Sequence, residues 1–150
     1  MAATAGEAVF VDTNVLVYSS LARSPLHGAA VQTLNSLRAD GGELWISRQV
    51  LREYIAVISR PHATTLADPL ATAIGDVRAY QSLFRIAEDG PTVTGHLLSL
   101  LTAIPCLGKQ VHDANIVATM LAHGLSQLLT HNTRDFSRFA AQITVIPLVP

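Results

Sequence analysis

The sequence predicts an α/β domain in which helices flank a largely parallel sheet. Short apolar runs, typical of buried strands, alternate along the chain with longer segments whose apolar residues recur at helical spacing. Apolar residues make up 49% of the 150 residues and charged residues only 14%, which excludes a disordered chain. No linker, repeat or low-complexity run interrupts this alternation, so we expect one domain over residues 1–150.

The first half of the chain supplies two strands and three helices. A valine-rich run predicts the first strand, and Thr13-Asn14 after it is a natural helix entry. Ser47 can cap the third helix, which ends before Pro61 because proline disfavours a helical residue before it. The expected elements are a strand at 8–12, a helix from 13 to a break near 24–25, a helix at 26–39, a strand at 44–46 and a helix at 48–60.

The second half repeats the alternation. The segment at 92–104 is almost entirely apolar, which predicts a helix buried on all sides. Gly124 ends the helix that follows it. The expected elements are a helix at 67–83, a strand at 84–87, helices at 92–104 and 112–123, and strands at 128–130 and 143–146.

We expect a cytoplasmic protein. Two charge-free stretches, 90–108 and 114–133, are broken by proline, glycine and polar residues, so neither predicts a membrane span. Residues 1–7 lack the basic region of a signal peptide. The lone Cys106 excludes an internal disulfide and is expected to be a small buried apolar residue. The net charge of −1 is not typical of a nucleic-acid binder. It is compatible with one if the basic residues cluster on one face, or if acids of the active site account for the negative charges.

Acidic residues fall where a parallel sheet binds ligands. Asp12 closes the first strand, Glu53 lies two turns into the helix after the second, and Asp113 begins the helix before the fourth. Thr130-His131-Asn132 follows that fourth strand directly. Ligands of open α/β sheets bind beyond the carboxyl ends of the strands. Carboxylates that share a site repel one another unless a cation compensates them, so a cluster here predicts a hard divalent metal.

Each acid has an ordinary structural alternative. Asp12 suits a helix cap, and Glu53 suits a solvated residue or an ion-pair partner of Arg52 or Arg60. Asp113 suits the favourable end of a helix dipole, and Asp135 suits the cap of a short helix. The metal-site prediction therefore depends on the ordered combination.

Four segments in this order resemble the PIN-domain family. The segment 9–16 (VFVDTNVL) is similar to the family's opening strand with Asp-Thr-Asn, and 50–53 (VLRE) to its second segment, in which a helix presents a glutamate. The segments 108–118 and 128–136 are similar to its third and fourth. The resemblance covers residues 9–146, and the compact VapC-type toxins of VapBC toxin–antitoxin modules are the most similar members in length and motif.

The resemblance implies a PIN-like, Rossmann-like three-layer domain with a mainly parallel sheet of about five strands. It also implies an endoribonuclease that depends on Mg²⁺ or Mn²⁺, forms a homodimer and is inhibited by a cognate antitoxin. By resemblance, the metal-binding acids are Asp12, Glu53 and Asp113. The fourth catalytic position falls on Asn132, a departure from those members that carry aspartate there. Asparagine brings no charge, so whether the site binds one metal ion or two stays open.

Four further residues would support this site, by resemblance: Thr13, Asn14 and Thr130 through hydrogen bonds, and Asp135 through its charge. The basic residues expected to contact RNA phosphates are two pairs spaced four apart, Arg48 with Arg52 and Arg134 with Arg138. A solvated or ion-paired face is the alternative for each pair.

Aromatic side chains near the motifs have structural interpretations that we favour. His112 and His131 adjoin motif residues, and structural roles are favoured over a general base. Core packing or a dimer contact is favoured for Tyr18 and Tyr54 over base stacking.

Two other functions remain open. One is a small metal-dependent nuclease acting on another nucleic acid, and the other is a PIN-like RNA- or protein-binding module without catalysis, its site degraded at Asn132. The dinucleotide-binding and P-loop glycine patterns, a His-Glu-x-x-His zinc motif and a serine-hydrolase elbow are all absent from the sequence.

Overall fold

The computed structural model describes residues 6–150. Residues 1–5, which belong to the segment 1–7 that we expect to lack a signal peptide, lie outside the described residues. The elements in chain order are β1 (Ala8–Val11), α1 (Thr13–Ser20), α2 (His27–Ala39), β2 (Glu43–Ser47), α3 (Arg48–Ile58), α4 (Pro69–Leu83), β3 (Arg85–Ala87), α5 (Pro91–Ala103), α6 (Gln110–Ala122), β4 (Gln127–Thr130), α7 (Thr133–Phe136), the 3-10 turn η1 (Ser137–Phe139) and β5 (Thr144–Pro147). The predicted α/β class is confirmed.

The five strands form one parallel sheet in the order β3-β2-β1-β4-β5. The chain moves outward from β1 to β2 and β3, then crosses back to place β4 on the other side of β1. The topological switch point therefore lies between β1 and β4. Open α/β sheets bind ligands in the crevice beyond the strand ends at such a point.

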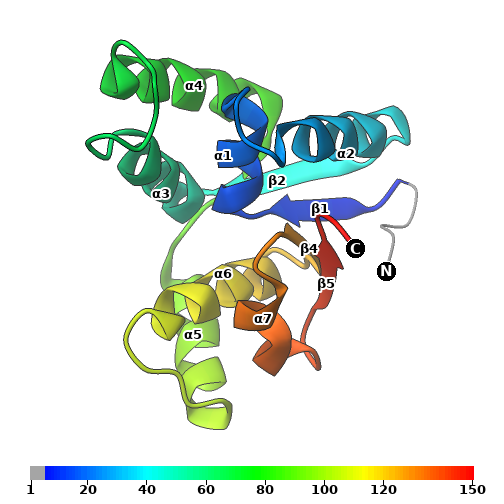
Figure 1. The fold of residues 1–150 in the computed structure, drawn as a ribbon. Coiled ribbons are helices and arrows are strands. Elements are labelled where there is room, and N and C mark those ends of the chain that lie inside the picture. The colour runs from blue at the N-terminus through cyan, green and yellow to red at the C-terminus, as the bar shows by residue number, and fades with distance from the viewer. Residues whose placement is uncertain (1–5) are drawn as a thin grey trace.

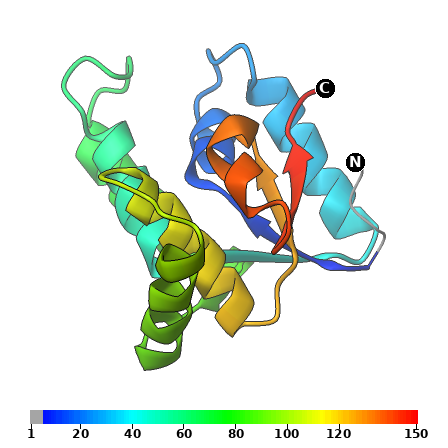
Figure 2. The ribbon, with the colours of Figure 1, turned by 90° about the horizontal axis from the view of Figure 1, so that it is seen from below.

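Helices cover both faces of the sheet. Figure 1 shows α1, α2, α3 and α4 above the strands and α5, α6 and α7 below them. The view from below places α5 and α6 side by side, and their residues are in contact (Figure 2). On the upper face α3 packs on both α1 and α4. The three-layer arrangement brings α1, α3, α6 and α7 close to the carboxyl ends of β1 and β4.

Local sequence explains the ends of two of these helices. The Ser47 hydroxyl accepts a hydrogen bond from the Val50 amide, so the predicted cap of α3 is confirmed. At the end of α6, Gly124 adopts a φ of +67°, a conformation that glycine reaches without steric cost. The Leu125 amide then donates to the Met120 carbonyl, which satisfies a free carbonyl of the last turn.

The prediction that the apolar helix at 92–104 is buried is wrong. In α5 only Val93 and Leu100 are buried, and Leu98 is 60% exposed. The helix packs mainly on α6 at the outside of the layer, so one stripe of it is covered and the rest faces solvent. Composition alone could not distinguish this outer position from a central one. Cys106, by contrast, is buried as predicted.

The other predicted elements are found at the expected positions, with ends that differ by a few residues. The sequence did not predict α7, a single turn whose residues were assigned only to a motif. Among residues 6–150, no helix combines the length and the apolar character that crossing a membrane requires.

Candidate active site

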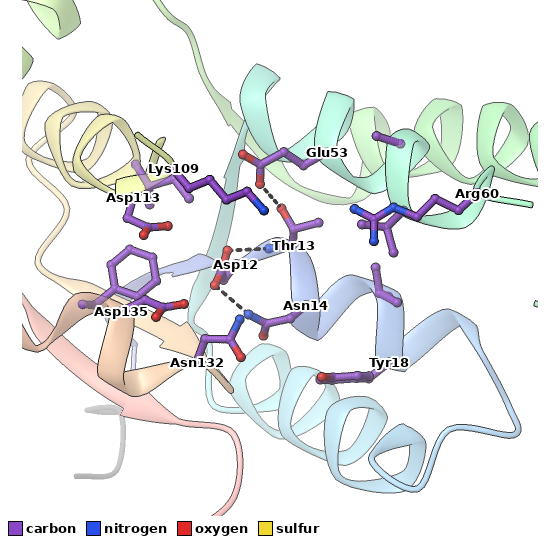
Figure 3. Close-up of a pocket in the computed structure, with 15 residues that line it drawn as sticks. Asp12, Thr13, Asn14, Tyr18, Glu53, Arg60, Lys109, Asp113, Asn132 and Asp135 are labelled. Atoms are coloured by element: carbon purple, nitrogen blue, oxygen red, sulfur yellow. Dashed lines mark hydrogen bonds between the residues drawn. The ribbon is translucent and has the colours of Figure 1, made fainter. Parts of the chain in front are cut away.

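A pocket of about 550 Å³ opens beyond the carboxyl ends of β1 and β4, at the switch point of the sheet. Residues from α1, α3, α6 and α7 line it together with the residues that follow the two strands (Figure 3). Its polar lining residues are Asp12, Thr13, Asn14, Tyr18, Glu53, Arg60, Lys109, Asp113, Asn132 and Asp135. All three acids predicted to bind metal therefore reach one cavity.

The Asp12 carboxylate is held in place by three donors. It is 6% exposed and accepts hydrogen bonds from the Thr13 amide (2.8 Å), the Asn14 side-chain amide (2.7 Å) and the Thr130 hydroxyl (2.7 Å). The Asn14 amide oxygen in turn accepts from the His131 backbone N–H at 3.0 Å. These contacts join the end of β1 to the end of β4, so the orientation of Asp12 is fixed by the sheet edge itself.

Glu53 is held equally firmly, from α3. Its carboxylate accepts from the Thr13 hydroxyl at 2.9 Å and from the Gln49 side-chain amide at 2.8 Å. The buried Gln49 also donates to the His112 carbonyl at 3.0 Å and accepts from the Asn115 side chain at 2.8 Å. Gln49 thus connects α3 to the first turn of α6, where Asp113 lies. We call Asp12 and Glu53 the held pair.

Asp113 and Asp135 differ from the held pair. Asp113 is half-buried in the first turn of α6, and Asp135 is exposed in α7. Among residues 6–150, neither side chain makes an ion pair or a hydrogen bond. The Asn132 side chain also has no hydrogen bond there, although its backbone N–H donates to Thr130. We call Asp113 and Asp135 the open pair.

The crowding of carboxylates changes their protonation. Burial, chiefly, together with the negative charges of Asp135, Asp12 and Glu53, raises the pKa of Asp113 to about 6, although Arg138 lowers it. Burial, chiefly, and the nearby Glu53 charge raise the pKa of Asp12 above its ordinary value, although its hydrogen bonds oppose the shift. Both shifts come first from burial, and neighbouring negative charge acts in the same direction.

The donor chemistry of the pocket fits a hard divalent cation. Four carboxylates and the amide oxygen of Asn132 are the ligand types that Mg²⁺ and Mn²⁺ prefer, and Mg²⁺ keeps several waters when it binds. In residues 6–150, no three carboxylate, imidazole or thiol groups converge closely enough to ligate one ion as they stand. The unpaired side chains of the open pair are the groups free to turn toward such an ion.

A family model described as the PIN domain matches residues 9–142. The chain belongs to the PIN-domain family. This PIN domain is 29% identical over 132 residues to the protein named Ribonuclease VapC48 of Mycobacterium tuberculosis, a match that covers 85% of this chain and 89% of the relative.

Solved structures share its fold. VapBC2 from Rickettsia felis, bound to a DNA fragment from its promoter, matches with a TM-score of 0.71 at 19% identity over 93% of this chain and 98% of the other. VapC20 of Mycobacterium tuberculosis, described as a toxin that cleaves the sarcin–ricin loop, matches with 0.67 at 18% identity over 91% and 96%. FitAcB from Neisseria gonorrhoeae matches with 0.66 at 22% identity over 93% and 97%.

The arginines predicted to contact RNA lie outside the lining of this pocket. Arg48 turns away to form a salt bridge with Glu88 (2.6 Å) and a hydrogen bond with Gln81, which is the alternative foreseen for it. Arg52 is exposed on α3. A role of either residue in RNA binding stays a prediction.

The second arginine pair does not share one continuous helix face. Because α7 ends at Phe136 and the 3-10 turn follows, Arg134 and Arg138 lie on different local helices. Arg134 borders two shallower depressions beside the pocket. Arg138 lies 3.9 Å from the Cys106 sulfur and near enough to Asp113 to oppose the rise in its pKa.

Sequence reasoning did not name Lys109 or Gln49 as site residues, and it named Arg60 only as a possible ion-pair partner of Glu53. Helical spacing could have found them. Arg60 follows Glu53 by seven residues, Lys109 precedes Asp113 by four, and Gln49 precedes Glu53 by four, so each falls near the same side of its helix.

The aromatic residues divide between core and pocket. Tyr54 is fully buried and donates its hydroxyl to Asp76 at 2.6 Å, as favoured for a core residue. Tyr18 is half-buried, lines the pocket and packs edge-on against His131, with ring centroids 5.6 Å apart. The side chain of His112 is exposed.

Proposed function

We propose that this PIN domain is a metal-dependent endoribonuclease that hydrolyses RNA phosphodiester bonds. The observation that carries the proposal is a single pocket that gathers carboxylates from β1, α3, α6 and α7, with no cation in the chain ion-paired to any of them among residues 6–150. The similarity to a protein named as a ribonuclease supports RNA as the substrate.

We assign the metal-binding role to Asp12, Glu53 and Asp113, and Asn132 and Asp135 add an amide oxygen and a carboxylate at the same edge. Mg²⁺ or Mn²⁺ would supply a water of lowered pKa as the nucleophile and would offset the charge that develops on the phosphate. The chain contributes fixed acceptors through the held pair. It contributes adjustable acceptors through the open pair.

Hydrogen bonds from the supporting residues keep the carboxylates of the held pair oriented into the pocket. Asn14 and Thr130 donate to Asp12, so this carboxylate keeps its orientation without an ion. Thr13 donates to Glu53 and prevents it from turning out of the pocket. Hydrogen bonds of this kind fix the direction of a ligand and raise the affinity of a site.

We further propose the biological setting. The domain, spanning residues 1–150, would be the toxin of a type II toxin–antitoxin system, a homodimer inhibited by a cognate VapB-like antitoxin. The named relative and the VapBC structures that share the fold support this setting. A toxin that cuts cellular RNA acts where that RNA is translated, so we place it in the cytoplasm.

Incubation with mixed cellular RNA tests the proposal. The purified wild type, with Mg²⁺ or Mn²⁺ and with EDTA, is compared with Asp12→Ala, Asp113→Ala and the control Asp40→Ala, an exposed acid at the end of α2. We expect metal-dependent cleavage by the wild type and the control only, and sequencing of the new ends names the substrate. Circular dichroism verifies that each variant is folded.

A wild type that binds no divalent metal and cuts no RNA would refute the enzyme. A non-catalytic binding module would then replace it. Cleavage of DNA in place of RNA would correct the substrate and keep the site.

A further inference from the structure

Within the part of the chain that the structure describes, two basic residues that line the pocket form no salt bridge with its acids. Lys109 immediately precedes α6, and Arg60 follows the end of α3. Both are exposed and line the pocket, and Figure 3 shows their charged ends pointing toward Thr13 from opposite sides. Among residues 6–150 neither forms a salt bridge. Their charged ends are therefore available to a ligand.

The positions of these two residues are set by the backbone. Gly108 has a φ of +56°, which suits glycine, and it immediately precedes Lys109, which lines the pocket. Arg60 lies one helical repeat beyond Ala56 and Val57, and all three line the pocket with Glu53. At 1.5 Å per residue, Ile58 at the end of α3 lies about 7.5 Å along the helix from Glu53, and Arg60 follows two residues later.

The wall between the acids and Arg60 is apolar. Ala56 and Val57 of α3 face the pocket, as do Val17 and Tyr18 of α1. Along α3 the lining therefore passes from Glu53 to the apolar Ala56 and Val57 and then to Arg60, whose charged end points back over this stretch toward Thr13. In a nucleic acid, successive phosphates are joined through a sugar that carries a base with an apolar face. Acids, an apolar surface and a cation in one pocket therefore suit one nucleotide with its flanking phosphates.

Charge gives a second reason to expect phosphate at the cations. The chain carries a net charge of −1, so it exerts no overall attraction on RNA. The pocket also presents four carboxylates, which repel a polyanion until metal binds. Local cations on both sides of the acids would offset this repulsion where the RNA backbone enters and leaves.

We propose that Arg60 and Lys109 bind RNA phosphates on opposite sides of the scissile one. The nucleoside that lies between the acids and Arg60 packs on Val17, Ala56 and Val57, beside Tyr18. Arg60 and this apolar stretch form one nucleotide subsite along α1 and α3. The inference rests on the proposed ribonuclease function and adds the path along which the RNA crosses the pocket.

The kinetics of two variants test the subsite. Arg60→Gln and Lys109→Gln are compared with the wild type and with Arg78→Gln, which removes the same charge from an exposed arginine of α4 outside the pocket lining. The substrate is the RNA that the wild type cuts, and kcat and KM are measured across a series of salt concentrations. Mn²⁺ affinity is measured by calorimetry for each protein.

For each pocket variant we expect KM to rise about tenfold while kcat changes by less than about threefold. The slope of log(kcat/KM) against log salt should become shallower by about 0.7, the value for one phosphate contact on a single strand. Mn²⁺ affinity should match the wild type, since neither residue is a metal ligand. Arg78→Gln should match the wild type throughout.

A wild type that cuts RNA, with Arg60→Gln and Lys109→Gln indistinguishable from Arg78→Gln, would overturn the subsite and leave the proposed function standing. A fall in kcat and Mn²⁺ affinity without a change in KM or salt slope would also overturn it. A wild type that cuts no RNA refutes the proposed function itself, and the subsite with it.

Discussion

The two walls of the pocket are built differently. On the side of β1 and α3, the held pair (Asp12 and Glu53) accepts five hydrogen bonds from Thr13, Asn14, Thr130 and Gln49. On the side of α6 and α7, the open pair (Asp113 and Asp135) accepts none from residues 6–150, and the pKa of Asp113 rises to about 6.

The chain's own hydrogen bonds orient the held pair, whereas the open pair would need a bound cation to orient it. A carboxylate with several donors is oriented before any ligand arrives, which reduces the entropy lost on binding. A carboxylate without donors, close to other negative charges, is stabilised most by an ion.

The largest expected effects come from neutralising one acid on each wall. Asp12→Asn and Asp113→Asn should each lower kcat/KM for RNA cleavage by more than about 100-fold, beyond the loss typical of a supporting residue. Their metal-free stabilities should differ. In Asp12→Asn, the new side-chain amide is a donor that faces the donors of Asn14 and Thr130, so the free energy of unfolding should fall by about 1–3 kcal/mol. Asp113→Asn removes a charge that no hydrogen bond or ion pair from residues 6–150 compensates, so Tm should rise.

Urea unfolding and thermal melts in EDTA measure these stabilities, with Asp40→Asn as the control. If Asp113→Asn lost as much stability as Asp12→Asn, the contrast between the two walls would be wrong.

Removal of the connection between the walls should have the next largest effect. Gln49→Met deletes the hydrogen bonds to Glu53 and to the His112 carbonyl but keeps the side-chain length. We expect kcat to fall about 10- to 100-fold and Mn²⁺ to bind more weakly, with little change in the KM for RNA.

Quenched time courses of RNA cleavage measure kcat and KM for Gln49→Met, and calorimetry measures its Mn²⁺ affinity. Gln81→Met, which removes a surface contact to Arg48, is the matched control. A rise in KM alone would show that Gln49 does not position the acids.

The pH dependence of metal-free stability should reveal the open pair directly. The pKa of Asp113 is about 6 in the folded protein and 3.8 in its ordinary state, so folding favours the protonated form. The resulting stability is fully present below about pH 3.8 and is lost as the pH rises through about 6. The raised pKa of Asp12 acts in the same direction.

In EDTA we therefore expect Tm to fall by a few degrees between pH 4 and pH 7. The fall should be smaller in Asp113→Asn and smaller in the wild type with excess Mg²⁺. Differential scanning fluorimetry between pH 4 and pH 7 measures Tm for the three samples. An equal fall in Asp113→Asn would assign the effect to other groups.

The smallest effect should come from adding a negative charge at Asn132, on the same side of the pocket as the open pair. Asn132→Asp places a fifth carboxylate in the pocket, so we expect Mn²⁺ affinity to rise about fivefold to tenfold because ligand charge tunes metal affinity. Metal-free Tm should fall slightly. Asn35→Asp on exposed α2 is the control for charge alone.

Calorimetry with Mn²⁺ also gives the stoichiometry of each protein. A second ion bound only by Asn132→Asp would show that Asn132 limits the wild type to one metal. Unchanged affinity would exclude Asn132 from the ligand set.

The sequence by itself determined the strands, most helices and the edge of the sheet at which the acids meet. Apolar runs favour burial, Ser47 and Gly124 set helix ends through local hydrogen bonds and φ, and parallel strands share one carboxyl edge. Asp12 directly follows β1 and Asn132 lies two residues beyond the end of β4, so their proximity follows from the order of the elements.

Tertiary structure decided what depends on side-chain direction and on contacts distant in sequence. It exposed most of α5, turned Arg48 toward Glu88, placed Gln49 between Glu53 and the start of α6, and brought Arg60 and Lys109 to one pocket. The physical reason is that a local pattern specifies which face of a helix is apolar, whereas the packing of neighbouring elements specifies what that face meets.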